Sequence, residues 1–324
     1  MRRRAFIAGL GSAAAWPLVA RGQQASVAHI AYLGATSATA LDPRQIEQFK
    51  QGLAENGLIE GSNIIVDYLW AEGSNERLRQ LASELAQRNL DVIVTAGPQP
   101  VRALLTTRTK TPIVFAIHTD PVGDGVVDSL ARPGGNVTGL SMANSNLESK
   151  RLEVLKDAFS GLKRVAILHD PTMGVSGLAD VELGARRLDL YALMFEAGDP
   201  ALFDTIFADA ANQGANGLAV MASPFLNYHH RRLIDLAIQK SLPSIWESAG
   251  IVRDGGLLSY GPSFPDMYRR SASYVAKILN GAKPSELPIQ QPIKFEFAVN
   301  LKSAKELGIV IPPTLLARAD EVIE

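Results

Sequence analysis

Small polar residues follow the apolar stretches in the first half of the sequence, at the points where strands of a parallel sheet would end. Hydroxyl groups and free backbone N–H groups at such positions can hold a small anionic or polar group, because they donate hydrogen bonds without burying a full charge. The candidate ligand-binding residues of this half are Gly34, Ala35, Thr36, Thr95, Gly97, Thr119 and Asp120.

The second half offers polar and aromatic residues at equivalent places. Glu247 ends an apolar stretch, where a carboxylate would be costly unless it has a partner. Glu247 or Asp120 could pair with an ammonium group, and Phe225 or Tyr260 could supply an aromatic wall. The candidate ligand-binding residues of this half are Thr172, Met173, Ser223, Phe225, Glu247 and Tyr260.

The same side chains have structural alternatives. Hydroxyls at strand ends also serve as helix caps or turn residues, so Thr36, Thr95, Thr119 and Thr172 fit either role. Asp120 is followed by a proline, a pairing typical of a helix start. The ligand-binding and capping interpretations therefore both stay open for these residues.

Sequence motifs for catalysis or cofactor binding are missing. There is no Gly-x-Ser-x-Gly elbow, no phosphate loop, no His-Glu-x-x-His and no Gly-x-Gly-x-x-Gly after a strand. The chain has no cysteine, which excludes disulfides, thiolate nucleophiles and Cys-ligated zinc. His229 and His230 are interpreted as a solvent-exposed helix face, because adjacent helical positions point about 100° apart and cannot converge on one metal. We expect no cofactor, no metal and no catalytic residue.

Composition and charge narrow the class of protein further. The chain has 324 residues, of which 47% are hydrophobic and 20% charged, as in ordinary globular proteins. Its 32 Lys and Arg against 33 Asp and Glu give a formal charge of −1. Because binding to a phosphate backbone needs a basic excess, we do not expect nucleic acid as a partner.

Short apolar stretches alternate with amphipathic helical patterns along the chain, which is typical of parallel sheets covered on both faces. In the first half, Asp42 and Pro43 predict the start of a helix whose apolar stripe includes Phe49 and Leu53. The strands predicted for this half cover residues 27–33, 63–70, 91–95 and 113–117. Those predicted for the second half cover residues 165–168, 190–195, 218–221 and 244–246.

These patterns predict an α/β protein with two Rossmann-like lobes, each built on a parallel sheet, and a cleft between the carboxyl ends of the two sheets. Such folds bind ligands at this edge. We assign residues 27–138 and about 262–284 to the first lobe. Residues 139–261 and about 285–324 are assigned to the second.

The first residues have the pattern of an export signal. Arg2, Arg3 and Arg4 precede an apolar stretch that is too short for a stable membrane anchor, and small residues follow it. The arginines and Phe6 also resemble the twin-arginine signature. We predict a signal peptide over residues 1–22, which is cleaved to leave an exported protein.

Seven stretches spread along the chain form a recognisable set: MRRRAFI at residues 1–7, FKQGL at 49–53, RPGGNVTG at 132–139, GGLLSYG at 255–261, QPIKFE at 291–296, NLKSAK at 300–305 and PPTLLARADEVIE at 312–324. With these stretches the sequence resembles the ABC transporter substrate-binding protein family, of the tryptophan/tyrosine type, nearly from end to end. One feature departs from this resemblance, because residues 169–174 read HDPTMG where relatives often have an Asn/Pro-rich loop.

The resemblance implies a type I periplasmic-binding fold that closes over one small molecule and delivers it to an ABC permease in the inner membrane. It further implies a monomer in the periplasm of a Gram-negative type of cell, with no lipid anchor because a cysteine is missing. The family description favours an aromatic amino acid, while the hydroxyl-rich strand ends would equally suit a sugar or an organic acid. Two alternatives stay open: an exported hydrolase that acts through Asp120 and Glu247, and a sensor protein that docks on a receptor.

Overall fold

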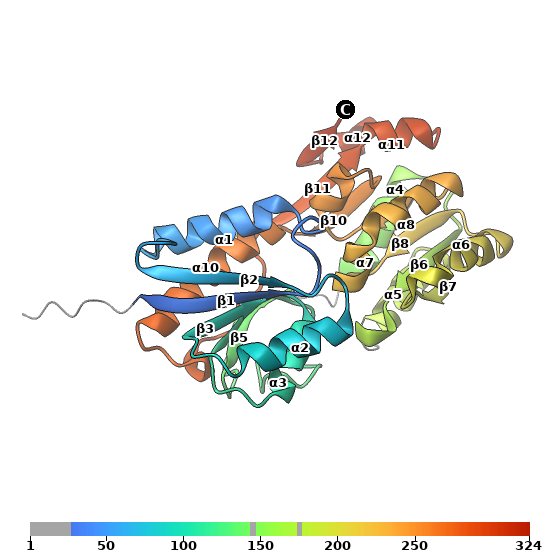
Figure 1. The fold of residues 1–324 in the computed structure, drawn as a ribbon. Coiled ribbons are helices and arrows are strands. Elements are labelled where there is room, and N and C mark those ends of the chain that lie inside the picture. Colours follow the sequence, from blue (N-terminus) through green and yellow to red (C-terminus); the bar gives the residue numbers. More distant parts are fainter. Residues whose placement is uncertain (1–26, 143–146, 174–176) are drawn as a thin grey trace, which may run out of the picture.

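The computed structural model describes residues 27–142, 147–173 and 177–324, which form two α/β lobes side by side (Figure 1). The predicted signal peptide, residues 1–22, lies outside the described residues. In the first lobe a parallel sheet has the strand order β2-β1-β3-β4-β5. Its strands are β1 (Ala28–Gly34), β2 (Ile64–Trp70), β3 (Val92–Thr95), β4 (Ile113–His118) and β5 (Val137–Ser141).

Helices cover both faces of the first sheet, as the alternating pattern predicts. On one face α1 (Pro43–Glu55) packs beside α10 (Phe264–Leu279), although the two helices are far apart in the sequence (Figure 1). On the other face lie α2 (Asn75–Leu85) and α3 (Pro98–Thr106). The start of α1 is fixed locally, since the Asp42 side chain accepts a hydrogen bond from the backbone N–H of Arg44 and Pro43 opens the helix.

The second sheet has the strand order β12-β11-β10-β9-β8-β6-β7. It is parallel except that β11 pairs antiparallel with β10, and β12 then pairs parallel with β11. This exception arises where the chain returns from the first lobe and enters the sheet from the opposite end. The strands are β6 (Arg164–His169), β7 (Tyr191–Glu196), β8 (Gly217–Val220), β9 (Ser244–Trp246), β10 (Leu258–Pro262), β11 (Phe295–Asn300) and β12 (Glu321–Ile323).

Helices again lie on both faces of the second sheet. One face carries α4 (Leu147–Ala158), α5 (Leu178–Arg187), α11 (Leu301–Glu306) and α12 (Pro313–Leu316). The other carries α6 (Phe203–Asn212), α7 (Pro224–Tyr228) and α8 (His230–Gln239). The remaining elements are α9 (Ala249–Arg253) and three short 3-10 turns, η2 (Pro171–Met173), η3 (Pro200–Leu202) and η4 (Pro284–Glu286).

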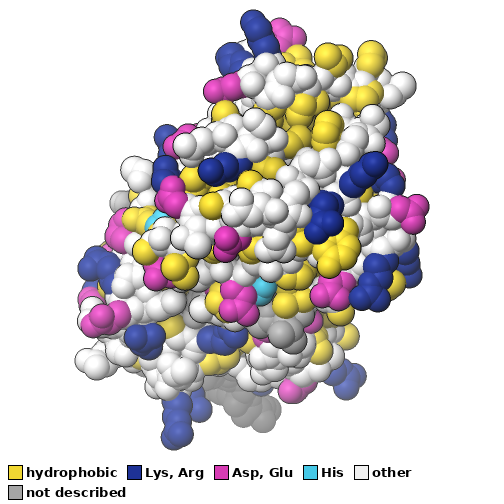
Figure 2. All heavy atoms as spheres, turned by 90° about the vertical axis from the view of Figure 1, so that its right-hand side faces the viewer, with side chains coloured by type: hydrophobic (Ala, Val, Ile, Leu, Met, Phe, Trp, Pro, Cys, Tyr) yellow, Lys and Arg dark blue, Asp and Glu magenta, His cyan; other side chains and the backbone are white. Residues whose placement is uncertain are grey.

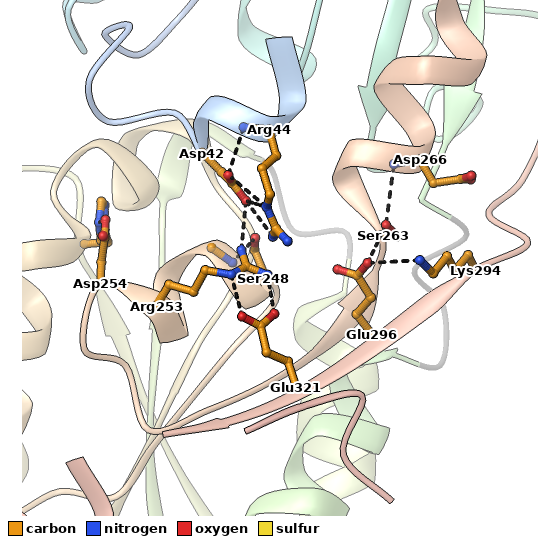
Figure 3. A network of polar contacts seen from close by, with 12 residues as sticks. Asp42, Arg44, Ser248, Arg253, Asp254, Ser263, Asp266, Lys294, Glu296 and Glu321 are labelled. Carbon is orange, nitrogen blue, oxygen red and sulfur yellow. Dashed lines mark hydrogen bonds and ion pairs between the residues drawn. The ribbon is translucent and has the colours of Figure 1, made fainter. Parts of the chain in front are cut away.

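The chain passes from one sheet to the other between β5 and α4, between β10 and α10, and between η4 and β11. The first sheet continues to Ser141, because Ser141 at the end of β5 still pairs with His118 of β4, whereas the sequence places a lobe boundary after residue 138. Two of these connections are held together side by side. Ser263, which caps α10, donates from Oγ to Glu296 Oε1 on β11 at 2.7 Å (Figure 3).

Candidate functional site

A cavity of about 290 Å³ lies between the lobes. Its volume is near the lower end of the range of about 300–1,000 Å³ that is usual for small-molecule sites, which suits one ligand of amino-acid size. The lining is mostly apolar and comes from both lobes. From the first lobe come the ends of β1, β3, β4 and β5 and the starts of α1, α3 and α10, and from the second come the loops after β8 and β9, with α7, α8 and α9.

Many of the residues predicted at the strand ends line this cavity. Their burial differs, since Glu247 is 0% exposed and Thr36 7%. The predicted residues found in the lining are Ala35, Thr36, Gly97, Thr119, Met173, Ser223 and Glu247.

Three predicted residues of the first lobe lie outside the lining, and each has a structural role. Gly34 packs against Trp70, where a Cβ atom would lie 2.4 Å from the indole ring. The Thr95 hydroxyl donates to the backbone oxygen of Leu33 on the neighbouring strand at 2.7 Å. Asp120 Oδ1 accepts from the N–H of Gly123 at 2.8 Å, which is the capping role weighed against ligand contact.

Three predicted residues of the second lobe also lie outside the lining of the main cavity. Thr172 and Phe225 line a neighbouring cavity of about 230 Å³. Phe225 packs edge-on against Phe203, with ring centroids 6.2 Å apart. Tyr260 stacks on Phe295 at a centroid distance of 6.3 Å, so neither predicted aromatic wall residue faces the main cavity.

The aromatic surface of the cavity comes instead from the first lobe. Tyr32 on β1 and Tyr268 and Phe264 on α10 line the cavity, and the hydroxyl oxygens of the two tyrosines lie 2.8 Å apart. Tyr32 and Tyr268 are separated by 236 positions in the sequence, so no local pattern brings them together. The only signal in the sequence is that Tyr32 lies near the end of the first predicted strand.

Glu247 is the most unusual polar group of the cavity. Its side chain is fully buried, and neither carboxylate oxygen has a hydrogen-bond partner among the described residues. Burial raises the pKa of the Glu247 carboxyl above its usual range, and the charge of Arg151 opposes that rise, as does the neighbouring side-chain amide of Asn227, although the amide makes no hydrogen bond of full geometry to it. A buried carboxylate without hydrogen bonds is costly, so the site is incomplete without a donor.

The charges around Glu247 do not balance. Arg151 is 1% exposed, forms an ion pair with Glu148 on the same helix and donates from Nε to the backbone oxygen of Tyr260 at 2.9 Å. Glu148 is also buried, at 4% exposure. If both carboxylates are ionised, two negative charges share the single positive charge of Arg151, so an ionised Glu247 needs a further cation.

Asn227 on α7 adds a further acceptor to the same cavity. Its Oδ1 is buried without a hydrogen-bond partner among the residues that the structure describes, and the side chain lines the cavity together with that of Glu247. Among the described residues the hydroxyl of Thr119 on the opposite lobe makes no hydrogen bond either, and it can donate to a ligand. The second-lobe wall therefore collects acceptors and the first-lobe wall holds a donor.

Direct polar contacts connect the lobes beside the main cavity and beside the neighbouring one. Arg253 Nη1 on α9 lies 3.1 Å from Asp42 Oδ2 at the start of α1 (Figure 3). A second connection involves Gln99 on α3, whose Nε2 donates to Asp170 Oδ2 at 3.3 Å after β6. Arg102 donates to the backbone oxygen of Thr172 at 2.9 Å. The interpretation of the strand-end loops as the facing edges of the two lobes agrees with these contacts.

The interpretation of both histidines as solvent-exposed is wrong for His230, which is 3% exposed and lines the cavity. Its Nε2 lies 2.7 Å from Asp254 Oδ2 and its Nδ1 lies 2.6 Å from the backbone oxygen of Asn227. The helical pattern places His230 beside two arginines, yet it cannot show that α9 and Asp254 pack over this residue. His229 is half-buried and packs edge-on against Phe225.

Within the described ranges, no group of three or more His, Asp or Glu side chains is arranged to hold a metal ion. No helix of the described part is long and apolar enough to cross a membrane. On the face shown in Figure 2, basic and acidic side chains are interspersed rather than gathered by sign.

Comparison with known proteins identifies the family. The sequence model of the family described as "ABC transporter substrate binding protein" matches residues 30–323. The chain belongs to this family. Its members bind substrates and do not convert them, so the alternative of a hydrolase acting through Asp120 and Glu247 is not supported, and Asp120 lies outside the cavity lining.

Relatives of this substrate-binding protein show the same fold. A tyrosine-binding protein of Clostridioides difficile (strain R20291) is 22% identical over 274 residues, covering 81% of this chain and 75% of that protein. A conserved domain protein of Vibrio cholerae has a TM-score of 0.85 at 27% identity, with 92% of this chain and 100% of that chain covered. An ABC domain from Streptococcus pneumoniae in complex with L-Trp has a TM-score of 0.85 at 23% identity, with the same coverage.

Proposed function

We propose that this substrate-binding protein captures an aromatic amino acid in the interlobe cavity and delivers it to an ABC permease. It acts as a monomer outside the cytoplasm, in the periplasm of a Gram-negative type of cell, and is exported through its twin-arginine-like segment at residues 1–22. The distant tyrosine-binding relative and the similar structure in complex with L-Trp support this ligand class.

The observation that carries the proposal is the unbalanced charge at Glu247. A ligand ammonium group has three N–H donors, and the cavity wall offers three buried acceptor atoms that make no hydrogen bond to any described residue, namely both carboxylate oxygens of Glu247 and Oδ1 of Asn227. Binding the ammonium also neutralises the negative charge left by Glu148, Arg151 and Glu247. A sugar brings no positive charge to pair with the Glu247 carboxylate, so the sugar alternative is disfavoured.

The remaining lining suits the rest of an aromatic amino acid. Tyr32, Phe264 and Tyr268 offer ring faces, and Met142 and Met173 offer polarisable sulfur atoms that pack well against a ring. The hydroxyl of Thr119 supplies a donor for the ligand carboxylate, whereas the hydroxyl of Thr36 donates to the backbone oxygen of Ser37 at 3.5 Å. Closure over the ligand excludes water and strengthens each of these hydrogen bonds.

The test compares ligands that lack one group at a time. Thermal unfolding of the mature protein is followed with L-tryptophan, L-tyrosine, L-phenylalanine, tryptamine, indole-3-propionate, and panels of aliphatic amino acids, sugars and organic acids. A ligand at 100 times its Kd stabilises the folded state by about 2.7 kcal/mol. We expect a rise with aromatic amino acids, a smaller rise with tryptamine and none with indole-3-propionate, which lacks the ammonium. A rise only with sugars or organic acids, or no rise at all, would overturn the proposal.

A further inference from the structure

The hydroxyl groups of Tyr32 and Tyr268 form a buried pair in the first-lobe wall of the cavity. The two oxygens are 2.8 Å apart, both side chains are 1% exposed, and both line the cavity. Each comes from a rigid element, since Tyr32 lies on the central part of the first sheet and Tyr268 on the helix that packs over it. The pair is thus a fixed polar point in an otherwise aromatic surface.

The hydrogens of this pair do not all have acceptors. A phenol carries one O–H hydrogen, and a single hydrogen bond between two phenols uses only one of their two hydrogens. Neither oxygen has another hydrogen-bond partner among the described residues. One hydroxyl hydrogen of the pair is therefore left without an acceptor in a buried site, which is unfavourable unless a ligand or a water accepts it.

The surroundings of the pair restrict where that acceptor can come from. The ring of Tyr32 packs against Trp70 at a centroid distance of 5.2 Å and against Tyr68 at 6.0 Å. Gly34 on β1 lets the Trp70 ring approach, because a Cβ atom there would lie 2.4 Å from it. Aromatic rings thus occupy the sheet side of the Tyr32 ring. The Tyr68 hydroxyl is buried near this ring but makes no hydrogen bond to the pair, and the cavity is the open space that both tyrosines line, so a ligand there can supply the acceptor.

We propose that the Tyr32–Tyr268 hydroxyl pair determines ligand specificity by donating a hydrogen bond to an acceptor atom on the aromatic ring of the ligand. The pair belongs to the first lobe and Glu247 to the second, so the two contact opposite ends of a ligand that spans the cavity. A phenolic ring supplies the acceptor, a phenyl ring has none, and an indole N–H can only donate. The preferred ligand is therefore a hydroxylated aromatic amino acid. This inference rests on the proposed function.

The test measures the Kd values of L-tyrosine and L-phenylalanine by calorimetry for the wild type and for Tyr32→Phe/Tyr268→Phe. Both hydroxyls are removed together because a single substitution would leave one buried oxygen without its partner. The control is Tyr274→Phe, which removes an α10 hydroxyl that donates to the backbone oxygen of Pro288 at 2.6 Å and does not line the cavity. Thermal unfolding confirms that each variant folds.

We expect the wild type and Tyr274→Phe to bind L-tyrosine roughly tenfold more tightly than L-phenylalanine, in line with one neutral hydrogen bond. In the double variant this ratio falls to about one. An unchanged ratio in the double variant, or an equal loss for both ligands, would overturn the inference and leave the proposed function in place. The wild type alone already provides a test, because equal Kd values of L-tyrosine and L-phenylalanine for the wild type also overturn the inference. If neither ligand binds the wild type, the inference fails, and the proposed function fails with it only if L-tryptophan does not bind either.

Discussion

Arg253 joins the two lobes through Asp42, with Nη1 and Oδ2 3.1 Å apart at the mouth of the cavity. The same guanidinium binds Glu321 on β12 through Nε, at 2.7 Å, and through Nη2 (Figure 3). Asp42 also caps α1, and Gly250 lies against it, since a Cβ atom there would be 3.0 Å from the Asp42 side chain. The helix that starts one lobe therefore meets the last strand of the other through one arginine.

Arg253→Gln should loosen the closed arrangement of the lobes. A partly exposed ion pair contributes about 1 kcal/mol, so we expect the ligand Kd to rise roughly fivefold. The radius of gyration of the ligand-bound protein, measured by X-ray scattering, should rise as well. The matched control is Arg269→Gln, which breaks the pair with Glu55 inside the first lobe. Equal affinities for both variants would show that the interlobe pair does not support closure.

Ligand affinity should rise with pH because of Glu247. Burial raises the pKa of this carboxyl, so the free protein keeps the proton to higher pH than an exposed glutamate does. Binding an ammonium needs the carboxylate, so binding releases a proton and strengthens as pH rises through the raised pKa. Calorimetry in buffers of different ionisation enthalpy measures the released proton. No proton release at any pH would contradict this role.

Glu247→Gln should weaken amino-acid binding and raise the stability of the ligand-free protein at neutral pH. It should weaken amino-acid binding by about 2 kcal/mol, roughly thirtyfold, and abolish the proton release. Because the folded pKa lies above the unfolded one, the wild type loses stability as pH rises from the unfolded value through the folded value. The variant, whose buried charges balance, should be more stable than the wild type at neutral pH without ligand. Glu84→Gln on α2 is a surface control, and a less stable Glu247→Gln variant would count against the charge argument.

Gly97→Ala should block the approach of the lobes. Gly97 has φ +94° and faces the second lobe, where an added Cβ atom would lie 2.7 Å from Pro224 Cγ. Gly57→Ala is the matched control, because Gly57 has φ +76° and no atom within 4 Å of its added Cβ. Both variants should lose about 1 kcal/mol of stability from backbone strain. Only Gly97→Ala should lose ligand affinity and compaction on binding, and equal binding by the two variants would contradict the steric argument.

His118 should make the protein sensitive to mild acid. The ring is 0% exposed, neither nitrogen has a hydrogen-bond partner among the described residues, and burial, aided by the charge of Arg102, lowers its pKa to about 3. In the unfolded chain His118 takes up a proton below the usual histidine pKa of about 6.5, whereas in the folded protein it does so only near pH 3. The free energy of unfolding therefore falls as the pH falls from about 6.5 towards about 3. Between pH 6.5 and 5 this amounts to about 2 kcal/mol.

Urea unfolding of His118→Leu at pH 7 and pH 5 checks this expectation. The variant should lose most of the difference between the two pH values, whereas His29→Gln, at a partly exposed site beside Asp67, should keep it. A pH dependence in His118→Leu equal to that of the wild type would show that another group is responsible.

Local sequence patterns were enough to predict the main strands, the start of α1 and the class of fold. The strand predicted over residues 244–246 is β9, and the cap at Asp42 with Pro43 starts α1 as expected. These features are local, because apolar alternation, caps and helix-starting prolines act within a few residues of each other. The burial of Glu247 was also visible, since an acidic residue directly after an apolar strand lies at the edge of a parallel sheet.

Packing between distant segments sets which of the strand-end residues line the cavity and which residues they contact there. Thr95 and Asp120 lie at strand ends like Thr119, yet their side chains bond to the protein itself, and only packing distinguishes them. The Tyr32–Tyr268 pair spans 236 positions and the Asp42–Arg253 pair 211, so neither leaves a local pattern. Such pairings depend on how helices and sheets pack after the chain has crossed between the lobes. The sequence could therefore predict at which edge of the sheets the site lies, but not which residues contact each other there.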